Sequence, residues 1–401
     1  MESKSTLERA IEEHKAGHRV NAEAAYRRIL ERQPGHPDAL NFLGMLRCQA
    51  GDPTEAAQLL RRSVEAEPSN PHAWLNLGNV LVIAGNQEEA RTAFTRATEL
   101  APNLAMTWFN LGVCLGRCKQ PREAASALHR ALKVEPGYLP AYEYLAHVLY
   151  RMGNFAEASE VYQEWLVYDP ENPVARHMLA ATSGTGAPSR AANDYVRHLF
   201  DDFAESFDER LASLQYRAPQ LVAQRLERDA SGDAGLNILD AGCGTGLCGP
   251  LVKPLASHLV GVDLSVGMID KARARGAYDE LAVAELCEFM RSRAGTFDVV
   301  VSADTLVYFG DLEEPLRAAR KCLRRGGRVI FTVERLDSTR DSDPQGPSYH
   351  LETHGRYSHA EGYVCGVLEA AGFAEVTIDS VILRRERGQE VVGLIVLARA
   401  A

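Results

Sequence analysis

Residues 237–249 read Asn-Ile-Leu-Asp-Ala-Gly-Cys-Gly-Thr-Gly-Leu-Cys-Gly. The apolar pair before Asp240 is typical of the end of a buried parallel strand. Glycine then occupies every second position from Gly242 to Gly246, which allows a sharp turn and lets a ligand approach the backbone. A strand, a glycine-rich turn and a helix together form the nucleotide-binding start of an open α/β sheet.

Two cofactors are compatible with this turn. The spacing Gly244-x-Gly246-x-x-Gly249, with Asp263 further along the chain, formally matches the dinucleotide fingerprint. Asp240 argues against a dinucleotide, because a carboxylate at this position repels a pyrophosphate. S-Adenosylmethionine has no phosphate and carries a cationic amine, so an acid followed by alternating glycines favours it. A glycine turn with a purely structural role is the third interpretation.

Residues 240–246 resemble the first motif of the class I methyltransferases, which bind S-adenosyl-L-methionine on a seven-stranded Rossmann-like α/β sheet. The resemblance implies that Asp263 accepts hydrogen bonds from both ribose hydroxyls. It also implies that Glu285 accepts one from the adenine amine, although Glu288 is close enough to be an alternative. The expected cofactor-binding residues are Asp240, Gly242, Cys243, Gly244, Gly246, Asp263, Leu264, Met268, Glu285, Leu286, Ser302 and Asp304.

Residues 297–303 are nearly all apolar, which is typical of a central parallel strand. Ligands of open α/β sheets bind at the carboxyl ends of the strands, so Asp304 and Tyr308 are expected to face the cofactor or the acceptor. Residues 303–306 read Ala-Asp-Thr-Leu. Methyltransferases that act on adenine or glutamine nitrogens carry Asp/Asn-Pro-Pro-Tyr here, so the resemblance disfavours those acceptors.

A long polar loop is expected at residues 335–358, and we interpret it as the acceptor loop. The candidates for a general base are His350, His354 and His359, with Tyr308 as a further candidate. Each can instead be an ordinary hydrogen-bonding or surface residue, and a carboxylate acceptor needs no base. The catalytic residue therefore stays unassigned.

Two further segments complete the expected second domain. Residues 195–211 predict one or two helices over the cofactor, in which Phe203 and Phe207 either cover the sulfonium or belong to the core. Residues 373–383 and 391–399 alternate apolar and polar side chains and predict an antiparallel pair, which brings the strand count to seven.

The first half of the chain has a period of 34 residues. Proline recurs at Pro34, Pro68, Pro102, Pro136 and Pro170. Leu-Gly pairs at 43–44, 77–78 and 111–112 keep the same register, and so do the aromatic residues Trp74, Trp108 and Tyr142. The pattern resembles the tetratricopeptide repeat over residues 3–170. It predicts five pairs of antiparallel helices in an all-α repeat solenoid.

The repeats also predict the turns and the domain boundaries. Glycine occupies the turn within a repeat at Gly17, Gly51, Gly85 and Gly153, whereas Lys119 replaces it in the fourth repeat. Residues 173–181 are expected to form a helix that caps the array. We therefore predict a repeat domain at 1–181, a linker at 182–190 and a methyltransferase domain at 191–401.

In such arrays the concave face binds partners, and it is lined by the first helix of each repeat. The polar residues predicted there are Asn41, Asn76, Asn79, Asn110 and Arg117. They either grip a protein or peptide partner or are solvated positions of an amphipathic helix. The array thus predicts a protein or peptide partner, while a small-molecule acceptor stays open.

Composition limits the other function classes. The chain has 401 residues and a formal net charge of −10, which disfavours a broad nucleic-acid surface. Its eight cysteines form no C-x-x-C pair, so no metal site is expected. Residues 1–9 are too polar for a signal peptide, and no apolar run is long enough to cross a membrane. We therefore expect a cytoplasmic protein without a membrane or nucleic-acid partner.

The leading hypothesis is an S-adenosylmethionine-dependent methyltransferase whose repeat array recruits a protein, a peptide or a partner that delivers a small molecule. The alternative is an interaction scaffold whose methyltransferase fold binds the cofactor but does not turn it over. A third hypothesis is a small-molecule enzyme whose repeats serve only assembly.

Overall fold

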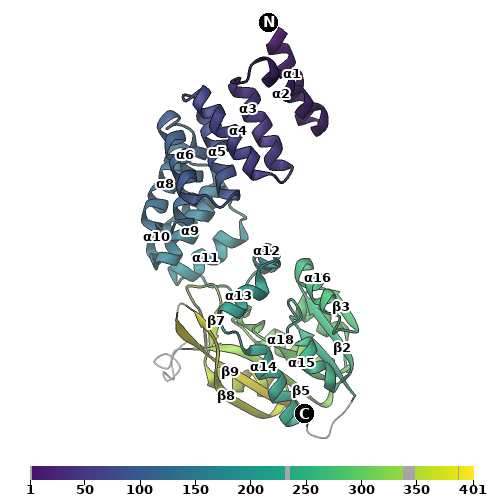
Figure 1. Cartoon of the computed structure of the whole chain (residues 1–401). Coiled ribbons are helices and arrows are strands. Elements are labelled where there is room, and N and C mark those ends of the chain that lie inside the picture. Colours follow the sequence, from purple (N-terminus) through teal and green to yellow (C-terminus); the bar gives the residue numbers. More distant parts are fainter. Residues whose placement is uncertain (1, 231–234, 337–347, 387) are drawn as a thin grey trace. The chain divides into compact units, whose positions relative to one another are not determined.

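The structure is a computed structural model of the whole chain, and it describes residues 2–230, 235–336, 348–386 and 388–401. The chain divides into two compact units, Met1–Pro170 and Glu171–Ala401 (Figure 1). Within the described ranges, no helix is both long and apolar enough to span a membrane.

The first unit is an array of paired antiparallel helices, which confirms the prediction from the 34-residue period. Along the array, each helix packs against the next one in the chain. The helices in its described residues are α1 (Glu2–Lys15), α2 (Arg19–Arg32), α3 (Pro37–Gln49), α4 (Pro53–Ala66), α5 (Pro71–Ile83), α6 (Gln87–Leu100), α7 (Ala105–Arg117), α8 (Pro121–Val134), α9 (Leu139–Met152) and α10 (Phe155–Tyr168).

The recurring glycine of the Leu-Gly pair lets the two helices of a repeat approach closely. A Cβ atom at Gly44 would lie 2.8 Å from Leu60 Cγ, and one at Gly78 would lie 2.5 Å from the ring of Phe94. A larger residue would have to displace these side chains, so the close packing of these helix pairs favours glycine.

The recurring aromatic residue also anchors the proline turn, a role that its period does not reveal. Trp74 Nε1 donates a hydrogen bond to the carbonyl of Pro68 at 2.9 Å. The same bond recurs one repeat later from Trp108 to Pro102 at 2.9 Å. The hydroxyl of Tyr142 donates to the equivalent carbonyl of the next repeat at 3.0 Å.

A nine-stranded mixed sheet, counted over the described residues, forms the centre of the second unit. The parallel strands follow the order β3-β2-β1-β4-β5, and antiparallel β9 and then β8 continue from β5. The strands are β1 (Leu236–Ala241), β2 (Ala256–Asp263), β3 (Glu280–Val283), β4 (Phe297–Ser302), β5 (Leu323–Arg335), β6 (Tyr349–Leu351), β7 (Tyr357–His359), β8 (Phe373–Glu386) and β9 (Gln389–Ala400).

Seven of these strands form the predicted Rossmann-like sheet, and the β6–β7 hairpin adds two that the sequence did not predict. The hairpin lies within the expected acceptor loop and pairs with the end of β5. Residues 337–347 of that loop lie outside the described residues. The strand order reverses between β1 and β4, which is where open α/β sheets bind their ligands.

Helices cover both faces of the sheet and bury two separate clusters. Neighbouring residues of β1 point to opposite faces, so Ile238 packs with Leu226 and Leu239 packs with Leu316. One face carries α14 (Ala218–Asp229) and α15 (Gly249–Val252). The other carries α17 (Leu286–Ser292), α18 (Glu313–Cys322) and α20 (Glu361–Ala370).

The boundary between the two compact units falls after Pro170 in the sequence, whereas the predicted repeat domain ends at residue 181. Helix α11 (Pro173–Ser183), expected to cap the array, contributes Ala180 and Ala181 to a cluster with Leu351 and Tyr357. The ring of His177 also hydrogen-bonds the Gly355 carbonyl at 2.8 Å. The contacts of these buried side chains place α11 with the second unit.

Part of the predicted linker is likewise built into the second unit. Ser189 accepts hydrogen bonds on its carbonyl from the N–H groups of Gly310 and Asp311, at 2.9 and 2.7 Å. The N–H of Ala191 donates to the Tyr308 carbonyl at 2.8 Å. We call residues 188–191 the docking segment, because its backbone runs along residues 308–311.

Candidate active site

The glycine turn lies between β1 and the loop that follows β4. The N–H groups of Gly242 and Cys243 both donate to the Val262 carbonyl at 2.9 Å. Gly242 has φ +80°, and a Cβ atom on it would lie 2.2 Å from Thr305 Oγ1, so the loop after β4 excludes any side chain here. Gly244 has φ +55° and open space around its Cβ position, which leaves the backbone accessible.

Asp263 stands at the carboxyl end of β2, beside this turn. Its Oδ2 accepts from the N–H of Gly244 at 2.9 Å, and its Oδ1 accepts from the N–H of Ser265 at 3.0 Å. Burial raises the pKa of Asp263, although these N–H donors oppose the rise. Each oxygen keeps a lone-pair direction for a further donor, as a pair of ribose hydroxyls would require.

Asp240 is 1% exposed and accepts a hydrogen bond from the Tyr278 hydroxyl at 2.6 Å. Burial raises the pKa of Asp240 to about 7, even though the bond from Tyr278 lowers it. No pattern in the sequence pointed to Tyr278. Its ring fills the space next to Gly249 and Gly261, where a Cβ atom would lie 2.7 and 2.9 Å from ring atoms.

Some of the other residues predicted to bind the cofactor are partly exposed, and others are buried. Leu264 is half-buried at the end of β2, whereas Met268 is fully buried in α16 (Val266–Arg275). Cys243 and Leu286 are also buried. Burial raises the pKa of the Cys243 thiol, which therefore stays protonated and serves packing.

Glu285 begins α17 and lies near the strand that carries Asp263. The N–H of Ala284 donates to the Asp263 carbonyl at 3.0 Å, so the two predicted ligand residues share one edge of the sheet. Glu285 Oε2 accepts from the N–H of Glu288 at 2.8 Å. Its Oε1 lies 3.1 Å from Nη1 of Arg190. Glu288 itself is exposed, which favours Glu285 as the predicted acid.

Two helices that precede the sheet attach through acidic residues to the glycine turn and to the residues after β2. They are α12 (Asn193–Phe203) and α13 (Phe207–Ser213). Asp208 accepts from Thr245 Oγ1 at 2.6 Å and pairs with Arg275. Asp201 accepts from the hydroxyl of Ser265. The acids of this segment thus hold it against the carboxyl ends of β1 and β2.

The loop after β4 holds two of the predicted residues by polar contacts. The Ser302 hydroxyl donates to the Ala241 carbonyl at 2.8 Å and so ties β4 to β1. Asp304 has φ +53°, a left-handed conformation that is costly for a residue with a side chain. Thr332 Oγ1 stabilises it by accepting from the Asp304 N–H at 2.9 Å and donating to Asp304 Oδ1 at 2.8 Å.

Asp304 belongs to a largely buried group of charges that we call the arginine–carboxylate cluster: Asp304, Glu334, His354, Arg356, Arg384 and Glu386. Arg384 binds Asp304 at 2.8 Å, Glu386 at 2.7 Å and also Glu334. Arg356 binds Glu334 and Glu386, each at 2.6 Å. Burial alone would raise the pKa of Glu334, but Arg356, His354 and Arg384 hold it well below its usual range.

Two of the predicted bases are held by structural contacts of their rings. His354 Nε2 lies 3.2 Å from Glu334, and its Nδ1 accepts from the N–H of Arg356 at 3.3 Å. His359 is fully buried, and its Nε2 donates to the carbonyls of Phe309 and Gly310 at 2.9 and 3.1 Å. Burial lowers the pKa of His359 to about 4, so the ring is neutral.

The other two candidates, Tyr308 and His350, are both half-buried. Tyr308 ends the short helix η2 (Leu306–Tyr308), and its ring makes an edge contact with Phe200 at 5.4 Å between centroids. Burial raises the pKa of Tyr308 to about 12. His350 is half-buried on β6, opposite Ser358 of β7. Tyr308 is therefore a hydrogen-bond donor at neutral pH.

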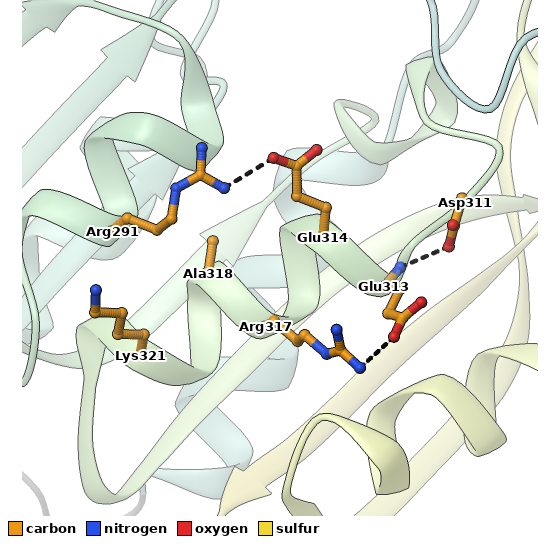
Figure 2. A pocket seen from close by; sticks show the side chains of 7 residues that line it. All are labelled: Arg291, Asp311, Glu313, Glu314, Arg317, Ala318 and Lys321. Carbon is orange, nitrogen blue, oxygen red and sulfur yellow. Dashed lines mark hydrogen bonds and ion pairs between the residues drawn. The ribbon is translucent and has the colours of Figure 1, made fainter.

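A separate groove of about 360 Å³ lies along α18 and contains none of the predicted site residues. Figure 2 shows Arg291 directed toward Glu314 and Arg317 toward Glu313. The Arg291–Glu314 distance is 2.8 Å. Both arginines of the groove are therefore compensated by internal ion pairs.

Family models match both halves of the chain. A tetratricopeptide repeat model matches residues 7–71, and a cytochrome c-type biogenesis protein H TPR domain model matches residues 58–176. A methyltransferase domain model matches residues 239–331, which include the glycine turn, Asp263 and the loop after β4.

The curated relatives that match this chain include methyltransferases. Methyltransferase-like protein 27 of Homo sapiens is 39% identical over 141 residues, which are 34% of this chain and 56% of that protein. The ubiquinone biosynthesis O-methyltransferase of Aromatoleum aromaticum is 32% identical over 112 residues, 27% of this chain and 47% of that protein. The chain thus spans about half the length of these relatives.

Among solved structures, YrrB, described as a TPR protein with an unusual peptide-binding site, aligns with a TM-score of 0.39 at 23% identity. The alignment covers 43% of this chain and 89% of YrrB. Taken with the paired helices and the glycine turn, the family matches identify a tetratricopeptide-repeat region followed by a methyltransferase domain.

Proposed function

We propose that the chain is an S-adenosyl-L-methionine-dependent methyltransferase whose repeat array recruits the acceptor or a partner that delivers it. The observation that carries the proposal is the Asp263 carboxylate, held by the N–H groups of Gly244 and Ser265 beside an open glycine turn. The remaining acceptor positions of this carboxylate suit two ribose hydroxyls, which donate. Asp240 in the same turn is unfavourable for a pyrophosphate.

The residues around the turn fit this cofactor. Asp263 would hold the ribose, Glu285 would accept from the adenine amine, and half-buried Leu264 would contact the purine. Asp240, together with the carbonyl groups of the glycine turn, suits the cationic amine of the methionine end. When bound, S-adenosylmethionine supplies a methyl group on a sulfonium, which is a good leaving group.

The chain's own task is to hold the acceptor in line with that methyl group and to exclude water. The contacts of Asp201 and Asp208 support α12 and α13 in excluding water. On the acceptor side, the arginine–carboxylate cluster would fix the position of Asp304, and Tyr308 would donate a hydrogen bond. The acceptor is a protein, a peptide or a small molecule, and the O-methyltransferase relative favours an oxygen atom for the small-molecule case.

Calorimetric titration of the intact chain with S-adenosylmethionine tests the cofactor. We expect a dissociation constant on the order of micromolar. The variant Asp263→Ala should weaken binding by at least about tenfold, because hydrogen bonds to a charged group are lost. Asp270→Asn on the exposed side of α16 is the matched control and should bind like the native chain. A folded native chain that does not bind would refute the proposal.

The inactive-scaffold alternative predicts cofactor binding without turnover. Incubation with methyl-labelled cofactor and cell lysate distinguishes the two, because an enzyme labels an acceptor and a scaffold does not. The label should disappear with Asp240→Ala. Recruitment by the array predicts that residues 171–401 alone label the same acceptor more slowly than the intact chain at low acceptor concentration. Equal rates would remove the recruiting role.

A further inference from the structure

The docking segment brings one cation to the predicted adenine site from outside the methyltransferase sheet. Its backbone is fixed by hydrogen bonds with residues 308–311. Tyr357, which is fully buried, adds a bond from its hydroxyl to the Pro188 carbonyl at 2.7 Å. The position of Arg190 is therefore set by the fold of the second unit.

The guanidinium of Arg190 is oriented from several sides. Nη1 lies 3.1 Å from Glu285 Oε1, and Nη2 donates to Asn193 Oδ1 at 2.5 Å. The same group lies over the ring of Phe309, 5.3 Å from its centroid. A weaker contact of 3.6 Å joins Nη1 to Glu314. Glu285 is only 11% exposed, so the pair is largely shielded from solvent.

These contacts leave the Glu285 carboxylate anchored but not saturated. Arg190 occupies one site on Oε1, and the N–H of Glu288 occupies one site on Oε2. A carboxylate has about four lone-pair directions, so roughly two are left for another donor. A purine with a 6-amino group supplies such a donor, whereas a 6-oxo purine presents an acceptor that the carboxylate repels.

We propose that Arg190 is a positioning residue for cofactor recognition: it orients Glu285 so that the carboxylate selects the amino group of adenine. The inference rests on the proposed function, because it assumes that an adenosyl cofactor binds at the glycine turn. It extends that site to the docking segment, which the sequence analysis interpreted as a linker.

Calorimetry on the intact chain tests this with two probes, S-adenosylhomocysteine and its 6-oxo analogue S-inosylhomocysteine. The native chain should bind the amino compound more tightly. We define the selectivity ratio as the dissociation constant of the 6-oxo analogue divided by that of the amino compound. In Arg190→Gln this ratio should fall by about threefold to tenfold, the size usual for coupled neighbours. Arg197→Gln, which alters an exposed arginine of α12, should leave the ratio unchanged.

A double-mutant cycle with Glu285→Gln separates positioning from a general structural effect. The double variant Arg190→Gln/Glu285→Gln should show no further loss of selectivity beyond Glu285→Gln, because Arg190 acts through that carboxylate. Arg190→Lys keeps the charge but not the two guanidinium nitrogens that contact Glu285 and Asn193. Its selectivity ratio should therefore lie between those of the native chain and Arg190→Gln. If Arg190→Gln does not fold, Asn193→Ala removes the partner of Nη2 and should lower the ratio instead.

Equal weakening of both probes by Arg190→Gln would overturn the inference, because a merely structural residue does not discriminate between amino and oxo groups. A native chain that binds both probes equally would overturn it as well. Binding of neither probe would instead refute the proposed cofactor, so the two failures are distinguishable.

Discussion

Two aspartates that end neighbouring strands show how environment assigns different roles to the same residue type. Asp263 accepts from two backbone N–H groups and keeps lone pairs for a ligand. Asp240 is almost completely enclosed and has Tyr278 as its hydrogen-bond donor. Asp263 therefore has the free acceptor positions that the proposed ribose contact needs, whereas burial raises the pKa of Asp240.

The raised pKa of Asp240 predicts that its contribution to the free energy of unfolding decreases as pH rises. The folded chain, with a pKa of about 7 here, binds the proton more tightly than the unfolded chain, whose value is 3.8. The stabilisation is complete below pH 4 and is lost as pH rises through 7, by roughly 1.4 kcal/mol per pH unit. Asp240→Asn should thus gain stability relative to the native chain over this range in urea titrations. A difference that is constant with pH would contradict the prediction.

Lys119 predicts a stabilising substitution in the array. It adopts φ +60°, where the equivalent turn residues Gly51 and Gly85 have φ +87° and +81°. Lys119→Gly should raise the free energy of unfolding by about 0.5–1 kcal/mol, because a left-handed backbone is strained for residues with a Cβ. The control Gly85→Lys should lose a similar amount. Tryptophan fluorescence measures both, since all three tryptophans lie in the first unit. No gain from Lys119→Gly would mean that its side chain stabilises the turn.

At the scale of elements, the arginine–carboxylate cluster joins strand ends that are far apart in the sequence. Arg384 of β8 connects Asp304 after β4 with Glu334 of β5. Arg356, just before β7, binds the same glutamate at 2.6 Å. The cluster therefore holds the β6–β7 hairpin and the acceptor side of the sheet in one arrangement.

Removing one partner of this cluster should lower the free energy of unfolding. Arg384→Gln leaves Asp304 and Glu334 buried without their shared cation, so we expect a loss of about 3 kcal/mol or more. The neighbouring Arg385→Gln removes only a half-exposed pair with Glu390 and should cost less than about 1 kcal/mol. Hydrogen exchange of peptides from β5 and β8 measures the difference. Equal protection in both variants would show that the cluster does not hold these strands.

At the scale of the whole molecule, the compact unit that begins at residue 171 predicts where the chain can be divided. A protein of residues 171–401 keeps α11 and the docking segment, whereas one of residues 192–401 loses the bonds from His177 to Gly355 and from Tyr357 to Pro188. We expect the shorter protein to melt roughly 10 °C lower, since several buried partners are lost. Calorimetric melting measures this, and equal melting temperatures would support the boundary predicted at 181.

The class of both halves follows from the sequence alone, because their signals are local. The 34-residue period repeats side chains that each contact only their neighbours, so the helical array follows directly from it. The glycine turn between an apolar strand and a helix likewise lies within one short segment. The position of Asp263 beside the glycine turn was predictable because it follows the next strand, and parallel strands end at one edge of the sheet. Its role in binding stays a prediction.

The surroundings of these residues, by contrast, depend on contacts between segments far apart in the sequence. Tyr278 reaches Asp240 across 38 positions, and Arg384 reaches Asp304 across 80 positions. His359, a candidate base from its residue type, is buried against backbone carbonyls because the hairpin folds onto the loop after β4. The physical reason is that burial and charge partners depend on strand order and on loops that fold back, and neither leaves a periodic pattern in the sequence.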